Sequence, residues 1–297
     1  MIETKNIKSI FITLPQRNLP DCAPPFGAMA VIKSLRKAGY KDTFLYNIDV
    51  LRPSREDAID YIVNYNPEIL CISAPVSTGY ENCKFFSLEL KQRLPNILIV
   101  LGGNMAVSAE ILLQKTGVDF CVLGEGEKVC CQLFDKVVRN RPRKEFYAIK
   151  GLAFLDGARF VNTGYADQLA KEDMFDVDWD VLDSASIKYC FRHVKDMDQQ
   201  HLKYIFNNAN GSLGPDSINN EERVLNKSIA SAFCSKGCVT RCTFCHRFNK
   251  GIRIIPPDIV ISRIKKLIER FNVGVVIFSD ECFGASSKWL REFCELI

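Results

Sequence analysis

The chain has 297 residues, of which 47% are hydrophobic, and this length and composition predict two well-packed domains. Its 39 basic and 35 acidic residues leave a formal net charge of +4, a balance that argues against a nucleic acid partner. The first residues lack the apolar core of a signal peptide, and no apolar run approaches the ~18 residues of a transmembrane helix, so we expect a cytoplasmic protein without membrane contact.

Residues 8–139 alternate short apolar runs with helical patterns. The predicted strands are residues 9–14, 43–48, 69–74, 97–101 and 120–123. The predicted helices are residues 26–38, 55–64, 81–94, 108–116 and 127–139. Five strands that alternate with helices predict a parallel, doubly wound α/β sheet of the Rossmann-like kind.

The loops after these strands are the expected binding region, because ligands bind at the carboxyl ends of the strands in such sheets. Glycines in these loops allow a large flat ligand to approach the backbone closely. Each loop taken alone is most often only a turn, and no G-x-G-x-x-G follows the first strand, which argues against a dinucleotide site. The candidate binding residues are Ser77, Thr78, Gly102, Gly103, Asn104, Gly124, Glu125 and Gly126.

The middle of the chain offers no motif to which we assign a chemical role. Residues 151–157 predict a hairpin, and residues 207–222, rich in Asn, Gly, Ser and Asp, predict a loop. We therefore expect a first domain of residues 1–140, a hairpin and linker region of residues 141–228, and a second domain of residues 229–297.

The second domain opens with a predicted strand, residues 229–233, that leads into a loop with four of the 13 cysteines. Cys238, Cys242 and Cys245 have the spacing C-x3-C-x2-C, so three thiolates can converge on one point. Three soft ligands select zinc or an iron–sulfur cluster. Zinc with Cys234 as the fourth ligand stays open, but zinc pairs are usually separated by a longer spacer, which favours iron and sulfur.

This loop resembles the signature of the radical S-adenosylmethionine (SAM) superfamily, C-x3-C-x-aromatic-C, with Phe244 as the aromatic residue. The resemblance implies a [4Fe-4S] cluster on Cys238, Cys242 and Cys245, with SAM on the fourth iron and Phe244 beside its adenine. Cys234 lies outside the signature, and we interpret it as a buried thiol at the end of a strand.

A helix that begins at residues 256–258, a strand at residues 274–278 and a helix at residues 286–296 follow the loop. Together with the first strand they predict the start of a parallel, partial (β/α) barrel of the radical SAM kind. About 68 residues follow Ile229, whereas a full barrel takes ~250 residues. We therefore expect a truncated barrel, and little or no radical chemistry from this chain by itself.

Two carboxylates, Asp280 and Glu281, stand at the end of the second barrel strand. In the radical SAM superfamily the segment at this point, often Gly-Gly-Glu, helps to hold the amino group of SAM. The resemblance makes both residues candidates for binding the SAM ammonium. The alternative is an acidic pair before the N-terminus of a helix.

The first domain resembles the cobalamin-binding domain found ahead of many radical SAM domains. The shared features are a Pro-Pro-x-Gly entry to the first helix, the Leu-Gly-Gly-Asn turn, the Val-Asp-Phe approach to the fifth strand and the Gly-Glu-Gly-Glu turn. The Asp-x-His-x-x-Gly motif of cobalamin-dependent mutases is missing from the sequence, whose histidines are His193, His201 and His246. The resemblance thus implies cobalamin without a histidine ligand on its lower face.

Taken together, the sequence resembles a cobalamin-dependent radical SAM enzyme. The resemblance implies reductive cleavage of SAM at the cluster, a small-molecule substrate, and an electron donor such as flavodoxin or ferredoxin. Methyl transfer to an unactivated carbon or phosphorus centre is the leading reaction, and oxidative cyclisation or ring rearrangement is the alternative within the family. The sequence assigns no catalytic residue.

Two hypotheses from other classes stay open. One is a non-catalytic cobalamin- or metal-binding fragment. The other is a transfer-RNA methylthiotransferase, which would share the cysteine loop but needs a second cysteine cluster in its first domain. The cysteines of that domain are scattered without motif spacing, at Cys22, Cys71, Cys83, Cys121, Cys130 and Cys131.

Overall fold

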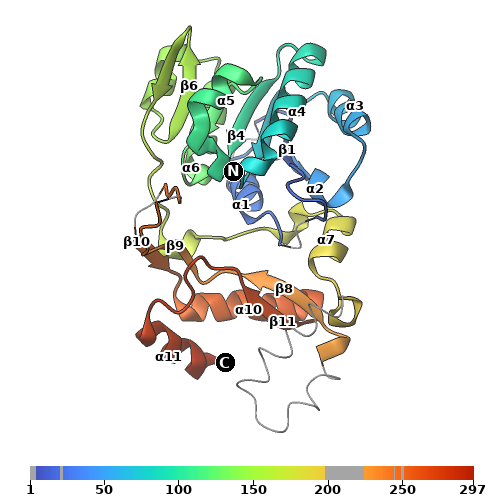
Figure 1. Ribbon diagram of the computed structural model, residues 1–297, viewed down its shortest axis with the longest axis vertical. Coiled ribbons are helices and arrows are strands. Elements are labelled where there is room, and N and C mark those ends of the chain that lie inside the picture. The colour runs from blue at the N-terminus through green and yellow to red at the C-terminus, as the bar shows by residue number, and fades with distance from the viewer. Residues whose placement is uncertain (1–4, 21–22, 198–223, 244, 249–250) are drawn as a thin grey trace. The chain divides into compact units, whose positions relative to one another are not determined.

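The computed structural model describes residues 5–20, 23–197, 224–243, 245–248 and 251–297. The chain forms two compact units (Figure 1). The first comprises Met1–Asp21, Pro25–Asp183 and Arg241–Asn249, and the second comprises Cys22–Pro24, Ser184–Thr240 and Lys250–Ile297. None of the helices in the described residues has the length and apolar character that crossing a membrane requires.

A seven-stranded sheet in the order β2-β1-β3-β4-β5-β6-β7 forms the centre of the first unit. Five strands are parallel: β1 (Ser9–Thr13), β2 (Thr43–Tyr46), β3 (Ile69–Ser73), β4 (Leu98–Gly102) and β5 (Phe120–Val122). The predicted hairpin forms β6 (Leu152–Asp156) and β7 (Arg159–Asn162), which join the β5 edge in antiparallel pairing. The predicted α/β fold with a mostly parallel sheet is confirmed.

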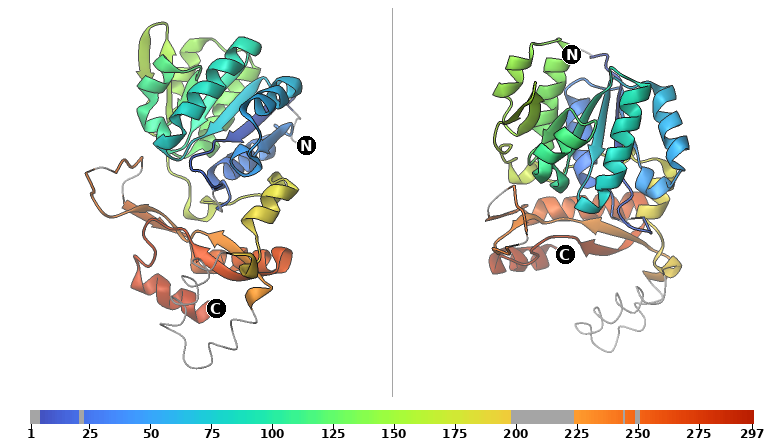
Figure 2. Two further views of the ribbon diagram at one scale, coloured as in Figure 1. Left: turned by 45° about the vertical axis from the view of Figure 1, so that its right-hand side comes forward. Right: turned by 45° about the horizontal axis from the view of Figure 1, so that its top comes forward.

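Helices cover both faces of this sheet (Figure 2). The α-helices are α1 (Phe26–Lys37), α2 (Ile48–Leu51), α3 (Arg55–Tyr65), α4 (Tyr80–Arg93), α5 (Ala109–Lys115) and α6 (Gly126–Val138). Short 3₁₀ turns are η1 (Ser77–Gly79), η2 (Asn104–Ser108), η3 (Arg143–Ala148), η4 (Lys171–Asp173) and η5 (Trp179–Val181).

The strands read as continuous apolar runs because both faces of the sheet are buried. Alternate strand residues such as Ile12, Ile72 and Leu101 pack in one core cluster with apolar residues of α3, α4 and α5. On the other face α1 packs against α6. All five residues of β1 are buried, so the sheet has a rigid centre from which its loops project.

The second unit contains the parallel pair β8 (Ser228–Ala232) and β11 (Val273–Phe278), joined through α10 (Pro257–Phe271). An antiparallel hairpin, β9 (Ser235–Cys238) with β10 (Gly251–Ile254), is inserted between β8 and α10. The remaining elements are α7 (Ser184–Cys190), η6 (Val194–Asp196) and α11 (Ser287–Leu296). The predicted β-α-β-α order is present, whereas the hairpin was not expected.

The turn after β4 depends on Gly103, whose φ of +95° lies in the region that favours glycine. A Cβ on Gly103 would lie 2.5 Å from the carbonyl oxygen of Ala74. That oxygen accepts a hydrogen bond from the backbone N–H of Met105 at 3.1 Å, so η2 is held against the end of β3.

We predict that Gly103→Ala lowers the free energy of unfolding by about 1–3 kcal/mol, because it combines a strained φ with a backbone clash. Urea unfolding followed by circular dichroism measures this loss. The matched control is Gly102→Ala, since a Cβ on Gly102 meets no heavy atom within 4 Å. Equal losses in the two variants would contradict the prediction.

Candidate functional site

The carboxyl edge of the parallel strands brings together the first group of predicted binding residues. Parallel pairing sets Ser73, the last residue of β3, level with Gly102, the last residue of β4. The turns that follow, η1 and η2, contact one another. Ser77, Thr78, Gly103 and Asn104 are exposed in these turns, and the position of a Cβ on Gly102 is open. This edge therefore offers hydroxyl, amide and bare backbone groups to a ligand.

The glycines of the turn after β5 lie in closer packing. Gly124 has a φ of +112°, and a Cβ on it would lie 3.3 Å from the Cβ of Ala166. A Cβ on Gly126 would lie 3.1 Å from Cγ2 of Val31 in α1. These two glycines thus let a strand-to-helix turn pack closely against its neighbours, and their contact with a cofactor stays a prediction.

Glu125 lies between these glycines and is only 4% exposed. Its carboxylate accepts a hydrogen bond from the backbone N–H of Leu169. In the same region the backbone N–H of Ala166 donates to the carbonyl oxygen of Leu123 at 2.8 Å. The carboxylate therefore fastens the segment after β7 to the end of β5, a role that the sequence did not reveal.

A buried polar chain at the end of β1 also escaped the sequence interpretation. The hydroxyl of Thr13 donates to Oδ1 of Asn47 at 2.7 Å and accepts from the backbone N–H of Asp49 at 3.1 Å. The guanidinium of Arg52 donates to Oδ1 of Asp49 at 2.7 Å and to the carbonyl oxygen of Arg17 at 2.9 Å. These bonds fix the loop after β1 at the same edge of the sheet.

The three signature cysteines lie at the tip of the β9–β10 hairpin. Cys238 ends β9 opposite Gly251 and is half-buried, whereas Cys242 and Cys245 are exposed. Sγ of Cys238 lies 2.9 Å from the hydroxyl of Thr240. The backbone N–H of Cys245 donates to the carbonyl oxygen of Cys242 at 3.2 Å. None of the three cysteines is part of a disulfide.

The donor set fits an iron–sulfur cluster by chemistry, since it provides soft thiols of which two are exposed. In the part of the chain that the structure describes, however, no group of three or more His, Cys, Asp or Glu side chains is arranged to hold a metal ion. The described residues between β9 and β10 form no helix or strand, so the sulfurs can be gathered without breaking regular structure. Phe244 lies outside the described residues.

The base of the hairpin is held by a chain of hydrogen bonds. The backbone N–H of Cys234 donates to both carboxylate oxygens of Asp280, at 3.1 and 3.2 Å. The backbone N–H and the hydroxyl of Ser235 also donate to Oδ1 of Asp280. The backbone N–H of Ile255 donates to the carbonyl oxygen of Cys234 at 2.7 Å, and Nε1 of Trp289 donates to the carbonyl oxygen of Ile255 at 2.6 Å.

Cys234 itself is 1% exposed. Burial and the neighbouring carboxylate of Asp280 raise the pKa of its thiol to about 12. Because the thiolate is the form that binds metals, a thiol with this pKa is a poor ligand at neutral pH. The structure thus supports the interpretation of Cys234 as a buried strand-end thiol.

The two carboxylates after β11 differ in their surroundings. Asp280 is half-buried and accepts the hydrogen bonds from Cys234 and Ser235, whereas Glu281 is exposed. Binding of the SAM ammonium by either residue stays a prediction.

His246 lies in an aromatic group. The centroid of its ring is 4.9 Å from that of Phe248 and 6.0 Å from that of Tyr165.

The cysteines of the first unit do not form a second cluster among the described residues. Burial raises the pKa of the Cys83 thiol to about 12 and that of the Cys131 thiol to about 11. Burial also raises the pKa values of Cys71, Cys121 and Cys130. All but Cys131, which is half-buried, are buried core residues, and Cys22 lies outside the described residues.

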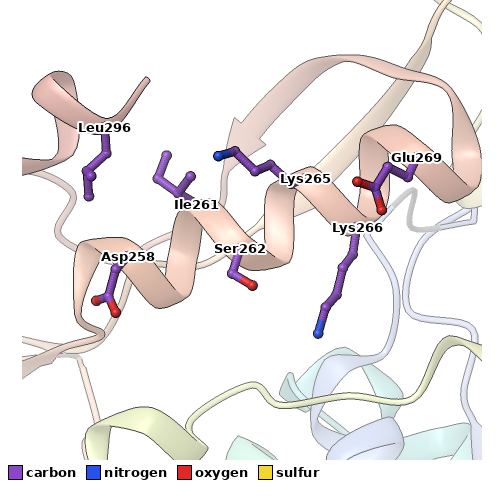
Figure 3. A pocket seen from close by; sticks show the side chains of 7 residues that line it. All are labelled: Asp258, Ile261, Ser262, Lys265, Lys266, Glu269 and Leu296. Atoms are coloured by element: carbon purple, nitrogen blue, oxygen red, sulfur yellow. The ribbon is translucent and has the colours of Figure 1, made fainter.

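An open hollow of about 470 Å³ lies along the outer side of α10, next to Leu296 of α11 (Figure 3). Its polar side chains include those of Asp258, Lys265, Lys266 and Glu269. Figure 3 shows Lys265 and Lys266 pointing in different directions, so the two cations do not converge on one ligand position. We therefore do not consider the hollow a candidate ligand site, unlike the two regions described above.

Comparison with known proteins finds relatives that align with most of the chain. Residues 15–134 match the B12 binding domain family. Over 276 residues the chain is 26% identical to the anaerobic magnesium-protoporphyrin IX monomethyl ester cyclase of Cereibacter sphaeroides, covering 92% of this chain and 40% of that protein. The cyclase of the same name from Rubrivivax gelatinosus is 24% identical over 278 residues, covering 92% and 44%.

Two solved proteins share the fold. The radical SAM methyltransferase TsrM from Kitasatospora setae, solved with cobalamin and a [4Fe-4S] cluster, has 14% identity and a TM-score of 0.63, covering 99% of this chain and 50% of that chain. The cobalamin-dependent SAM radical enzyme OxsB, solved with aqua-cobalamin and SAM, has 15% identity and a TM-score of 0.65, covering 98% and 37%.

In sequence the chain resembles these cyclases, and in fold it resembles solved cobalamin-dependent radical SAM enzymes. The match of the B12 binding domain and the likeness to the cyclases over most of the chain confirm the resemblance seen in the sequence. The chain spans less than half the length of these curated relatives.

We predict that Glu125→Ala lowers the free energy of unfolding by about 1–3 kcal/mol, because it leaves the buried N–H of Leu169 without its carboxylate acceptor. The matched control is Glu125→Gln, which keeps an acceptor oxygen and should lose less. Urea unfolding measures both variants. A full loss of cobalamin binding with unchanged stability would instead assign Glu125 to the ligand.

Proposed function

We propose that this chain carries the cobalamin-binding and cluster-binding parts of a radical SAM enzyme that cleaves SAM reductively at a [4Fe-4S] cluster. The observation that carries the proposal is the combination of a B12 binding domain match with a C-x3-C-x2-C loop on the hairpin that follows the first strand of a parallel βα unit. In open parallel sheets and barrels, ligands bind at the carboxyl ends of the strands, where both features lie.

Cobalamin binding is assigned to the exposed turns after β3 and β4. Ser77 and Thr78 offer hydroxyl groups, Asn104 offers an amide, and Gly102 and Gly103 allow close approach to the backbone. When bound, cobalamin would supply a methyl carrier or a redox partner. The missing Asp-x-His-x-x-Gly motif favours binding without a histidine ligand to cobalt.

Cluster binding is assigned to Cys238, Cys242 and Cys245, whose thiols must lose their protons to bind iron. When bound, the cluster would supply the electron that cleaves SAM. Cys234 is buried and is not proposed as a ligand, so three protein ligands leave one iron position for SAM. Phe244 is proposed to lie beside the adenine, and an electron donor such as flavodoxin or ferredoxin is proposed to reduce the cluster.

Methyl transfer to an unactivated centre of a small molecule is the first candidate reaction. Oxidative cyclisation is the second, and it is favoured by the likeness to proteins named as cyclases over 92% of the chain. The buried cysteines of the first unit count against a transfer-RNA methylthiotransferase, since such an enzyme needs a second cluster there.

We predict that anaerobic reconstitution with iron and sulfide gives about four irons per chain and a broad brown absorbance. A triple variant, Cys238→Ala, Cys242→Ala and Cys245→Ala, should lose both, because it removes every proposed ligand. The matched control is Cys234→Ala, which should keep the cluster. Stoichiometric zinc with no uptake of iron would contradict the proposal.

We also predict that hydroxocobalamin binds the full chain and shifts its visible spectrum. Gly102→Leu should weaken binding at least about tenfold, since its side chain enters the open edge. Lys41→Leu is the control, because Lys41 is exposed just before β2, at the amino edge of the same sheet. In the Co(II) form, labelling the protein with ¹⁵N should leave the spin-resonance splitting unchanged; a change would reveal a protein nitrogen on cobalt.

A further inference from the structure

We propose that Asp280 is a positioning residue, whose carboxylate fixes the hairpin that carries the cysteine loop, and that it does not contact SAM. The hairpin meant here is β9 with β10. The proposal rests on the proposed function only where it concerns the cluster, because the hydrogen bonds that it describes join residues of this chain to one another.

Strand register brings Asp280 to its partners. Ala232, the last residue of β8, pairs with Phe278, the last residue of β11. One residue further, the backbone N–H of Ser279 donates to the carbonyl oxygen of Ala232 at 2.9 Å. Asp280 and Cys234 each follow two residues after the last pair, so parallel pairing delivers the carboxylate to the place where the chain leaves β8 for the hairpin.

The carboxylate of Asp280 satisfies three donors there. Two are the backbone N–H groups of Cys234 and Ser235, and the third is the hydroxyl of Ser235. Cys234 is 1% and Ser235 3% exposed, so water cannot readily replace the carboxylate. Hydrogen bonds to an ionised acceptor are stronger than neutral ones, and buried donors left unpaired are strongly unfavourable.

The second strand of the hairpin, β10, is held at its end through the carbonyl group of Cys234. The carbonyl oxygen of Cys234 accepts from Ile255, which directly follows β10, and the carbonyl oxygen of Ile255 accepts from the indole of Trp289 in α11. Both peptide groups of the hairpin base are therefore paired, with Asp280 on one side and Trp289 on the other. The hairpin thus leaves the barrel strand in one fixed direction.

If Asp280 binds the SAM ammonium, removing its negative charge should weaken SAM binding. If Asp280 only positions the hairpin, a neutral acceptor at this place should be sufficient. Oδ1 accepts from all three donors, and the amide oxygen of an asparagine can take its place. Asp280→Asn should therefore keep the hairpin base, whereas Asp280→Ala should open it. Binding of an ammonium group would instead require the negative charge that both variants lack.

The experiment measures amide hydrogen exchange in the full chain without cofactors, at the peptide that contains Cys234 and Ser235. Asp280→Ala should exchange these amides at least about tenfold faster than wild type. Asp280→Asn and the control Glu281→Ala should stay within about threefold of wild type. Unchanged protection in Asp280→Ala would overturn the proposal. If that variant fails to fold, accelerated exchange in a folded Asp280→Asn would overturn it as well.

Iron content after anaerobic reconstitution then tests the consequence for the cluster. Asp280→Ala should retain less than about half of the wild-type iron, while Asp280→Asn and Glu281→Ala should retain it nearly fully. Full iron uptake by an Asp280→Ala variant whose hairpin base has opened would overturn the positioning role. Loss of SAM affinity in Asp280→Asn, with its exchange and iron content intact, would show a direct contact and also overturn it. If wild type takes up no iron, the proposed function fails, while the exchange data still decide the hairpin.

Discussion

Parallel strand pairing is the constraint on which the rest of this protein depends. The carboxyl ends of parallel strands all lie at the same edge of the sheet. Residues that are far apart in the sequence therefore lie close together at that edge. In the first unit this edge collects the turns after β1, β3, β4 and β5. In the second unit the pairing of β8 with β11 brings Asp280 to the base of the cysteine hairpin.

Carboxylates that are buried or half-buried hold the loops at these edges in both units. Glu125 accepts the backbone N–H of Leu169, and Asp280 accepts those of Cys234 and Ser235. In each case an acidic residue two or three positions after a strand accepts backbone N–H groups from a segment that lies far away in the sequence. A carboxylate used in this way is well suited to hold a functional loop, because its ionised oxygens can accept several hydrogen bonds at once.

The two proposed cofactor regions differ in how far the fold prepares them. The cobalamin edge is built on strands whose residues are almost entirely buried, and its turns are fixed by close backbone packing at Gly103. The cysteine loop has its base held by hydrogen bonds to Asp280, while Cys242 and Cys245 are exposed in a segment without helix or strand among its described residues. This difference fits a loop whose sulfurs are brought together by the metal itself, since metal binding commonly supplies the free energy that orders its site.

The sequence by itself determined the elements and the donor types. Buried parallel strands appear as uninterrupted apolar runs and covering helices as one-sided patterns, so β1, β3, β4 and most helices could be placed, and the spacing of Cys238, Cys242 and Cys245 indicated a cluster. Only the tertiary structure decided that β6 and β7 extend the sheet, that Cys234 is buried, and that Glu125 and Asp280 hold loops. The roles of Glu125 and Asp280 depend on hydrogen bonds between residues 44 and 46 positions apart, and no local pattern specifies such partners.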